Sequence, residues 1–226
     1  MKFKMKQPND LNDYYHAFNS ENIQYYDSLK KYFMLTKKVK GDILEFGIGR
    51  ARSTIALCHL IHENKLKKNF LAFDSFKGFG YISKEDISLR KPKNKDWSIS
   101  PKNQFRYNKK NIKKILNNHI YKSNFRDVTL IGDYVEKSLP KNIEKIKSIS
   151  FINLDLDLYS GHKIVLEKTF EKVSKYGIIY FDDVGPDYAK KKFPGAEKAV
   201  REFFKGKKNI KKYICQKRKN LVIQKI

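Results

Sequence analysis

Short apolar segments alternate with amphipathic ones along most of this chain, and this alternation most restricts the possible fold. Five apolar runs have the length and composition of buried strands: GDILEFGIG (41–49), NFLAFDSF (69–76), DVTLIGD (127–133), SISFINLDLD (148–157) and GIIYFDDV (177–184). Helical patterns cover 53–65, 161–177 and 195–206. Strands that alternate with helices form a parallel sheet with helices on both faces, so we predict an α/β fold.

Three segments lie outside this alternation. Residues 1–40 carry aromatic and aliphatic side chains at helical spacing and predict N-terminal helices. The C-terminal segment KKYICQKRKNLVIQKI resembles two strands joined by a charged turn, which would add antiparallel strands at one edge. Residues 77–127 are rich in Lys and Asn, contain Trp97 and a helical stretch over about 103–118, and predict a functional lid. We therefore expect a single domain over residues 1–226, with seven mostly parallel strands.

The chain is strongly basic, with a net charge of +25. Such a charge would suit an anionic partner such as nucleic acid, a membrane surface or a phosphorylated substrate. Only seven of the 49 basic residues are arginines, however, and nucleic-acid sites favour the bidentate fork of arginine. A lysine excess with much Asn and Ile is also what codon bias in an AT-rich genome produces, and we favour that interpretation over functional basicity.

Targeting signals are not evident in the sequence. No run approaches 18 apolar residues, and no apolar region of a secretory signal follows the charged N-terminal residues. Cys58 and Cys215 match no metal or redox spacing, so we expect buried thiols in a cytoplasmic protein.

The segment LEFGIGRARST (44–54) has the pattern of a cofactor-binding loop, in which glycines let a ligand approach backbone N–H groups. A dinucleotide fingerprint needs a third glycine where this chain has Arg52, so S-adenosylmethionine is favoured over NAD(P). Glu45 suits the amino acid end of that cofactor, and Asp74 suits its ribose hydroxyls. The predicted cofactor-binding residues are Glu45, Gly47, Gly49, Ser53, Asp74, Ser75, Gly132, Asp133 and Asp155.

Aspartates follow two of the predicted strands in pairs. Asp155, Asp182 and Asp183 would converge at one edge of the sheet if their strands are neighbours. Carboxylates alone, without His or Cys, favour Mg²⁺, with Mn²⁺ or Ca²⁺ as alternatives. Asp157 would share a face with Asp155 and is a candidate catalytic base. N-capping of the following helices is the alternative interpretation of these aspartates.

Several of these segments together resemble the macrocin O-methyltransferase (TylF/MycF-type) family over roughly residues 41–206. They are LEFGIGRARST, AFDSFKGFG, LIGDYVEKSLP, FINLDLDLYSGHK, GIIYFDDVG and PGAEKAVREFF. The resemblance implies a class I S-adenosylmethionine-dependent methyltransferase fold, with Mg²⁺ held by Asp155, Asp182 and Asp183. It also implies methylation of a sugar hydroxyl on a small molecule. The chain departs from the family at Gly161 and His162, where a Ser-Thr pair is common, and His162 is a second candidate base.

Two other functions remain open at this point. The basic charge and the lysine-rich lid also fit an RNA methyltransferase, which would bind RNA with a steep salt dependence. An NAD(P)-dependent oxidoreductase fits the sequence less well because of Arg52. We expect a small-molecule acceptor, with no membrane partner, and the N-terminal aromatic helices could form a homo-oligomer interface.

Overall fold

The computed structural model describes residues 20–99, 106–120, 128–185, 194–216 and 218–226. At its centre is one sheet with the strand order β3-β2-β1-β4-β5-β7-β6. The strands are β1 (Asp42–Phe46), β2 (Phe70–Asp74), β3 (Val128–Gly132), β4 (Ile149–Leu154), β5 (Val173–Phe181), β6 (Ile210–Ile214) and β7 (Leu221–Lys225). Strands β1 to β5 are parallel, and β7 is antiparallel to both β5 and β6. The predicted seven-stranded sheet with an antiparallel C-terminal hairpin is confirmed.

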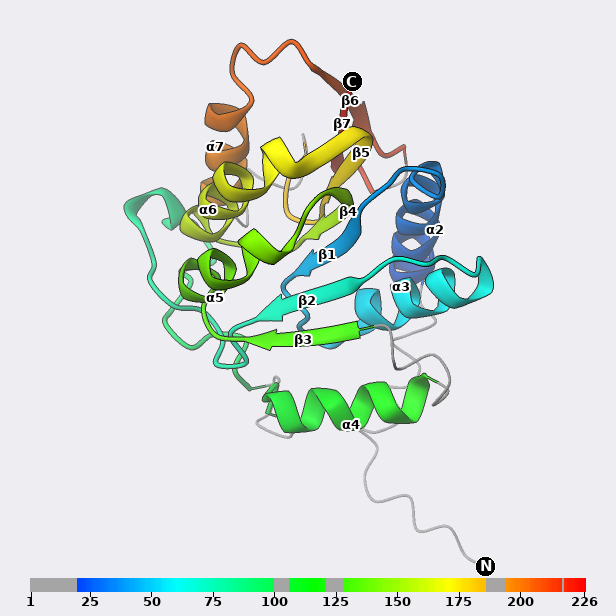
Figure 1. Ribbon diagram of the computed structural model, residues 1–226. Helices are drawn as coiled ribbons and strands as arrows, with labels where there is room; N and C mark the ends of the chain where they lie inside the picture. The colour runs from blue at the N-terminus through cyan, green and yellow to red at the C-terminus, as the bar shows by residue number, and fades with distance from the viewer. Residues whose placement is uncertain (1–19, 100–105, 121–127, 186–193, 217) are drawn as a thin grey trace, which may run out of the picture.

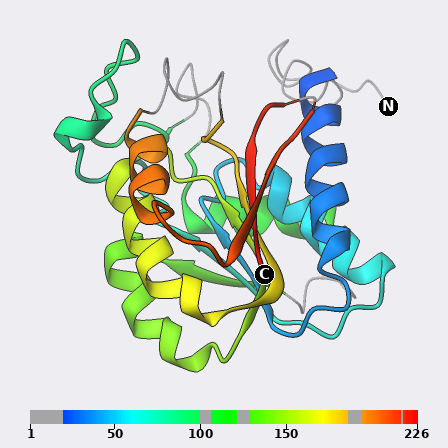
Figure 2. The ribbon, with the colours of Figure 1, turned by 90° about the horizontal axis from the view of Figure 1, so that it is seen from above.

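Helices cover both faces of this sheet (Figures 1 and 2). One layer contains α5 (Val135–Asn142), α6 (Tyr159–Thr169) and α7 (Pro194–Phe203), and the other contains α2 (Ser20–Leu35), α3 (Arg52–Glu63) and α4 (Lys109–His119). Each layer has its own apolar core, because successive strand residues point to opposite faces. In β1, for example, Leu44 belongs to the core beneath α5–α7 and Ile43 to the core beneath α2–α4.

The predicted element boundaries need two corrections. The helix expected over 161–177 ends at Thr169, and a short 3₁₀ turn then leads into β5 at Val173. Val173 is buried and pairs with Ile149. Pairing in the sheet therefore makes residues 173–177 part of a strand, although their local sequence pattern continues the helix. Helix α3 begins at Arg52 after Ala51, which has a left-handed φ of 62° and gives no side-chain cap.

The lid expected at 77–127 contains a 3₁₀ turn at Lys84–Asp86 and α4, and its residues 100–105 and 121–127 lie outside the described part of the chain. Residues 1–19 of the predicted N-terminal helices also lie outside it. Both cysteines are free and buried, as predicted. Among the described helices, none has the length and hydropathy needed to cross a lipid bilayer.

Chain direction around the sheet fixes where a ligand can bind. Strands β2 and β3 lie on one side of β1 in the sheet, and β4 and β5 lie on the other side. The order of the strands therefore reverses between β1 and β4. The helices that follow β1 and β4 therefore lie on opposite faces, and a crevice opens between the carboxyl ends of these two strands. Ligands of open α/β sheets bind at such a crevice.

Candidate active site

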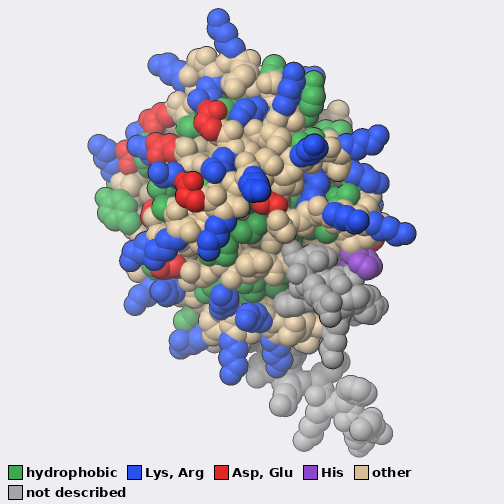
Figure 3. Space-filling model, in the orientation of Figure 1, with side chains coloured by type: hydrophobic (Ala, Val, Ile, Leu, Met, Phe, Trp, Pro, Cys, Tyr) green, Lys and Arg blue, Asp and Glu red, His purple; other side chains and the backbone are tan. Residues whose placement is uncertain are grey.

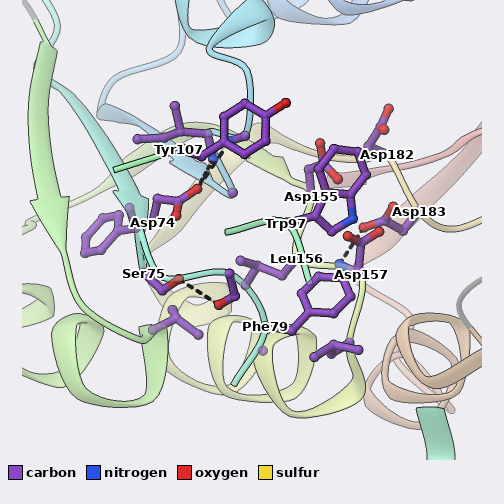
Figure 4. Close-up of a pocket in the computed structure, with 18 of the residues that line it drawn as sticks. Asp74, Ser75, Phe79, Trp97, Tyr107, Asp155, Leu156, Asp157, Asp182 and Asp183 are labelled. Carbon is purple, nitrogen blue, oxygen red and sulfur yellow. Dashed lines mark hydrogen bonds between the residues drawn. The ribbon is translucent and has the colours of Figure 1, made fainter. Parts of the chain in front are cut away.

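A cavity of about 870 Å³ lies at the carboxyl ends of the parallel strands. Its walls come from the loops that follow β1 to β5, from the lid, from α2 and from the turn between β6 and β7. Figure 4 shows Asp74 and Ser75 on one side of it and the aspartates that follow β4 and β5 on the other. The predicted site residues that line the cavity are Gly47, Gly49, Ser53, Asp74, Ser75, Asp133, Asp155, Asp157, Asp182 and Asp183.

The loop after β1 (residues 47–51, here the glycine loop) passes directly beside the end of β4. A Cβ atom on Gly47, whose φ is 87°, would overlap the carbonyl oxygen of Asp155. The Asp155 N–H also donates to the Phe46 carbonyl at 2.8 Å. At Gly49 the φ is 49° and the space that a Cβ would occupy is open. The loop is therefore held against β4 on one side and left open to a ligand on the other.

Asp74 fixes this glycine loop from the end of β2. Its Oδ2 accepts hydrogen bonds from the N–H groups of Ile48 (2.8 Å) and Gly49 (3.2 Å), and its Oδ1 accepts one from Phe76 at 2.6 Å. Burial raises the pKa of Asp74, and the three N–H donors offset part of that rise. One carboxylate thus ties together the first two strand ends while it faces the cavity.

The predicted cofactor-binding residues at the ends of β2 and β3 differ in their contact with the cavity. Ser75 lines the cavity, and its hydroxyl donates to the Gly78 carbonyl at 2.8 Å, which secures the first turn of the lid. Asp133 also lines the cavity and lies 3.8 Å from the Lys77 ammonium. Gly132 is exposed at the end of β3 and is not among the residues that line the cavity. Of the predicted Gly132–Asp133 pair, only Asp133 is therefore placed to meet a ligand.

Glu45 lies beneath the glycine loop rather than in the cavity wall. It is completely buried, its Oε2 accepts a hydrogen bond from the Thr54 hydroxyl (2.6 Å), and its Oε1 accepts one from the Asn153 amide (3.1 Å). Burial raises its pKa to about 7, although hydrogen bonds from Ser53, Thr54 and Asn153 act in the opposite direction. Glu45 therefore joins β1 to α3 and β4, and the predicted direct contact with the cofactor does not follow from this placement.

Asp155, Asp157 and Asp183, here called the acidic cluster, bring one carboxylate oxygen each to within 4.8 Å of the others. The Asp157 N–H donates to Asp183 Oδ2 at 2.8 Å, and Asp157 has a left-handed φ of 62°. Burial raises the pKa of Asp157 to about 8, and the negative charge of Asp155 adds to the effect. Burial and mutual repulsion likewise raise the pKa values of Asp155 and Asp183. Burial and mutual repulsion therefore disfavour three negative charges in the cluster, and a bound cation would offset them.

Asp182 lines the same cavity but has a different partner. Its Oδ1 accepts from Arg218 Nη1 at 2.9 Å, and that guanidinium lies over the Tyr25 ring, 4.6 Å from its centre. The predicted set of Asp155, Asp182 and Asp183 thus shares two members with the acidic cluster, and Asp157 takes the third place in the observed geometry.

His162 does not reach the cavity, so the structure argues against its predicted role as a base. It is completely buried in α6, its Nδ1 lies 3.0 Å from the Leu158 carbonyl, and its ring stacks on Phe181. Burial lowers its pKa to about 4, so the ring is neutral. His162 is close in sequence to the aspartates that follow β4, because it lies in the first turn of α6. Its side chain, however, points into the core and not into the cavity.

The lid is attached to the helices that follow β4 and β5. Asp86 is buried, and its Oδ1 accepts from the Tyr159 N–H at 2.8 Å, while its Oδ2 accepts from the Ser83 N–H (2.9 Å) and hydroxyl (2.6 Å). A Cβ atom on Gly195 in α7 would overlap the Asp86 carboxylate. This contact holds the first half of the lid over the acidic side of the cavity.

Sequence reasoning did not select several other lining residues, among them Tyr25, Arg50, Arg90 and Arg218. Tyr25 belongs to α2, Arg90 to the lid, and Arg218 to the turn between β6 and β7. For the three arginines the available signal was their identity, because arginine is rare in this chain. The local pattern placed Arg50 in the glycine loop, but it did not place Tyr25, Arg90 or Arg218 at the strand ends.

The sheet order, the glycine loop and the acid at the end of β2 define a class I methyltransferase fold. Among solved structures, the calicheamicin methyltransferase CalS11 matches with a TM-score of 0.72 at 20% identity, covering 99% of this chain and 87% of that one. The O-methyltransferase NovP matches with a TM-score of 0.69 at 17% identity, covering 90% and 80%. No curated protein matches significantly in sequence.

The sequence profile of the macrocin O-methyltransferase (TylF) family matches residues 26–219. The chain belongs to this family and is an S-adenosylmethionine-dependent O-methyltransferase. The predicted family, fold and enzyme class are confirmed, and the oxidoreductase alternative gains no support.

Proposed function

We propose that this enzyme methylates a hydroxyl group of a sugar-type small molecule with the help of a divalent cation in the acidic cluster. The observation that carries the proposal is the contact between Gly47 and Asp155, which puts the cofactor loop and the acidic cluster side by side. Support for a sugar acceptor comes from CalS11, which is described as a TDP-rhamnose 3′-O-methyltransferase.

The residues of the glycine loop fit S-adenosylmethionine. Gly49 leaves backbone uncovered, Asp74 offers carboxylate oxygens for ribose hydroxyls, and Asp133 lies at the next strand end. When bound, S-adenosylmethionine supplies an electrophilic methyl group. Glu45 acts on this binding indirectly, because it fixes β1 against Thr54 and Asn153 beneath the loop. Asp155 belongs to the acidic cluster and its backbone contacts the glycine loop, so it would sit between cofactor and acceptor.

The acidic cluster fits a hard divalent cation such as Mg²⁺. Its three ligand atoms are all carboxylate oxygens within 4.8 Å of one another, and burial makes three negative charges unfavourable without a counter-ion. Asp155, Asp157 and Asp183 would hold the ion. A cation there lowers the pKa of a coordinated hydroxyl and favours its deprotonated form.

The remaining walls orient the acceptor. The lid covers the acidic side of the cavity through the Asp86 contact, which limits the access of water to the reacting groups. Arg218 holds Asp182 beside the cluster and keeps that carboxylate paired. Alignment of the acceptor oxygen with the methyl group is the main contribution expected from such a rigid site.

Four single variants test the cation site: Asp155→Asn, Asp183→Asn, Asp157→Asn and Asp182→Asn. We expect the first three to weaken Mg²⁺ or Mn²⁺ binding by at least about 100-fold, since each removes an anionic ligand, and Asp182→Asn to weaken it by less than about tenfold. Calorimetry measures the affinity of each variant for S-adenosylhomocysteine and then, with that ligand bound, its affinity for the cation. Methyl transfer to a glycoside panel should stop after treatment with EDTA and return with Mg²⁺.

Three outcomes would change the proposal. Unchanged methyl transfer after complete chelation would remove the cation from the reaction. A larger loss for Asp182→Asn than for Asp157→Asn would restore the set predicted from sequence. An Asp157→Asn variant that binds Mg²⁺ normally but transfers no methyl group would make Asp157 the base. The RNA methyltransferase alternative stays a prediction, and a gel shift at low salt tests it.

A further inference from the structure

Arginine is concentrated in the active-site cavity although it is rare in the chain. Of the seven arginines, Arg50, Arg52, Arg90 and Arg218 line the cavity. The chain has 42 lysines, and none of the described lysines lines the cavity. Basic side chains elsewhere are spread over the face shown in Figure 3 without a single patch. The composition that favours lysine on the surface therefore does not account for the basic groups of the cavity.

Arginine and lysine differ in what they recognise. The planar guanidinium presents paired N–H donors that match the oxygens of a phosphoryl or carboxylate group and stacks on aromatic rings, whereas an ammonium ion is a compact charge. A cavity that needed only positive potential could use lysine, which this chain has in excess. Selective use of arginine points to oriented hydrogen bonds with an anion.

Two of the four cavity arginines, Arg52 and Arg218, have partners that explain their position without a ligand. Arg218 pairs with Asp182 and lies over the Tyr25 ring, and Arg52 donates to the Asn22 side chain at 3.1 Å. These contacts attach α2 and the β6–β7 turn to the rim of the site. They account for Arg52 and Arg218 without a ligand.

Arg50 and Arg90 share one aromatic surface instead. Their guanidinium carbons lie 6.0 Å and 5.7 Å from the centre of the Trp97 ring. Arg50 Nε donates to the Tyr107 hydroxyl at 3.1 Å, and within the described chain no carboxylate forms a salt bridge with Arg50. Arg50 thus brings a positive charge into the cavity that no salt bridge from the described residues neutralises.

The backbone holds Trp97 in this place. Trp97 has a left-handed φ of 64°, which is unusual for a large side chain, and its ring remains 38% exposed. The turn that contains it is paired with the lid entry, since the Phe79 N–H donates to the Asp96 carbonyl (2.8 Å) and the Lys95 N–H donates to the Phe79 carbonyl (2.9 Å). An exposed aromatic ring kept in a strained conformation at a cavity wall is typical of a binding position.

We propose that Arg50, Arg90 and Trp97 form a subsite for a phosphoryl group of the acceptor, so that the substrate is a phosphorylated or nucleotide-activated sugar. This inference rests on the proposed sugar O-methyltransferase function and specifies its substrate class. The subsite adjoins the acidic cluster, because Arg90 and Trp97 line the same cavity as the cluster. One small molecule can therefore present a hydroxyl to the cluster and a phosphoryl group to the two guanidinium groups.

The test measures binding of three probes by calorimetry to the full chain saturated with S-adenosylhomocysteine and Mg²⁺. The probes are methyl glucoside, glucose 1-phosphate and UDP-glucose. We expect both phosphorylated probes to bind at least about tenfold more tightly than methyl glucoside. If glucose 1-phosphate binds more tightly than UDP-glucose, the acceptor is a sugar phosphate. If UDP-glucose binds more tightly, the acceptor is a nucleotide-activated sugar.

Arg50→Gln and Arg90→Gln should each weaken binding of the phosphorylated probes about tenfold and leave the affinity for S-adenosylhomocysteine within about twofold. Lys113→Gln on the exposed face of α4 is the charge-matched control, and it should change neither affinity. Equal binding of neutral and phosphorylated probes would overturn the subsite, as would an equal loss in the Lys113→Gln control. A loss of S-adenosylhomocysteine binding in Arg50→Gln would assign that guanidinium to the cofactor carboxylate and also overturn it.

This experiment distinguishes failure of the phosphoryl subsite from failure of the proposed function. A chain that binds S-adenosylhomocysteine and Mg²⁺ but shows no phosphoryl preference contradicts only the subsite. A chain that binds neither of them contradicts the proposed function itself.

Discussion

The two halves of the cavity are built in different ways. The proposed cofactor half consists of the loops after β1, β2 and β3, and Gly47, Asp74 and Asp133 each lie at a strand end there. The acceptor half combines the lid, α2 and the β6–β7 turn around the acidic cluster, so Trp97 and Arg218 come from remote parts of the chain. Under the proposed function, donor binding therefore depends on strand ends that are close to one another in the sheet, and acceptor binding depends on contacts between remote segments.

Asp74→Ala should affect the cofactor half most strongly. The substitution removes the acceptor of the Ile48 and Gly49 N–H groups and the expected partner of the ribose hydroxyls. Hydrogen bonds to a charged group are worth roughly 1.5–3 kcal/mol each, so S-adenosylhomocysteine should bind at least about 100-fold more weakly in calorimetry. Asp74→Asn keeps one acceptor oxygen and should lose less. A comparable loss of Mg²⁺ affinity would mean that the two halves are coupled.

Glu45→Gln tests the support beneath the cofactor half through its pH dependence. The pKa of Glu45 is about 7 in the folded protein against 4.5 for the free side chain, so the folded state keeps a proton that the unfolded state loses. The contribution of Glu45 to stability is therefore complete below about pH 4.5 and is lost as the pH rises through 7. At pH 8 the variant should be more stable by up to about 3 kcal/mol.

Chemical denaturation between pH 4 and 8 measures this effect. The wild-type free energy of unfolding should fall across the window more steeply than that of Glu45→Gln. The amide also offers a donor to Asn153 Oδ1, which is buried without a hydrogen-bond partner among the described residues. A variant that is less stable than the wild type at pH 8 would show that the carboxylate itself is needed there.

Asp86→Ala should affect the acceptor half alone. It removes the acceptor of the Tyr159 and Ser83 N–H groups and so releases the lid from α6. We expect amide exchange in residues 77–99 to become roughly tenfold faster or more, because two buried donors lose their partner. The affinity for S-adenosylhomocysteine should stay within about twofold. If the affinity for S-adenosylhomocysteine also fell about tenfold, the two halves of the cavity would not be independent.

His162→Leu should give the smallest functional effect. The imidazole is buried away from the cavity, and its Nε2 has no hydrogen-bond partner in the described structure. Affinities for S-adenosylhomocysteine and Mg²⁺ should stay within about twofold. The folded pKa of about 4 lies below the ordinary 6.5, so wild-type stability falls as the pH drops through that range, and the variant should lack this loss. A selective loss of methyl transfer would restore His162 as a base.

The sequence alone determined the cofactor half of this enzyme. Apolar runs of strand length, each followed by Gly or Asp, predict both the parallel sheet and the residues at its carboxyl edge, because strand ends are set by local patterns. Gly47, Asp74 and Asp133 were found in this way, and all three line the cavity.

Only the tertiary structure decided the acceptor half. β4 ends at Leu154, so strand alternation no longer governs Asp157, whose left-handed backbone turns it toward Asp183. Asp182 has the same chemistry as Asp183, but a guanidinium 36 residues further along the chain pairs with it. Local periodicity carries no information about contacts between remote segments, and the burial of His162 and the meeting of Arg50 with Trp97 depend on such contacts.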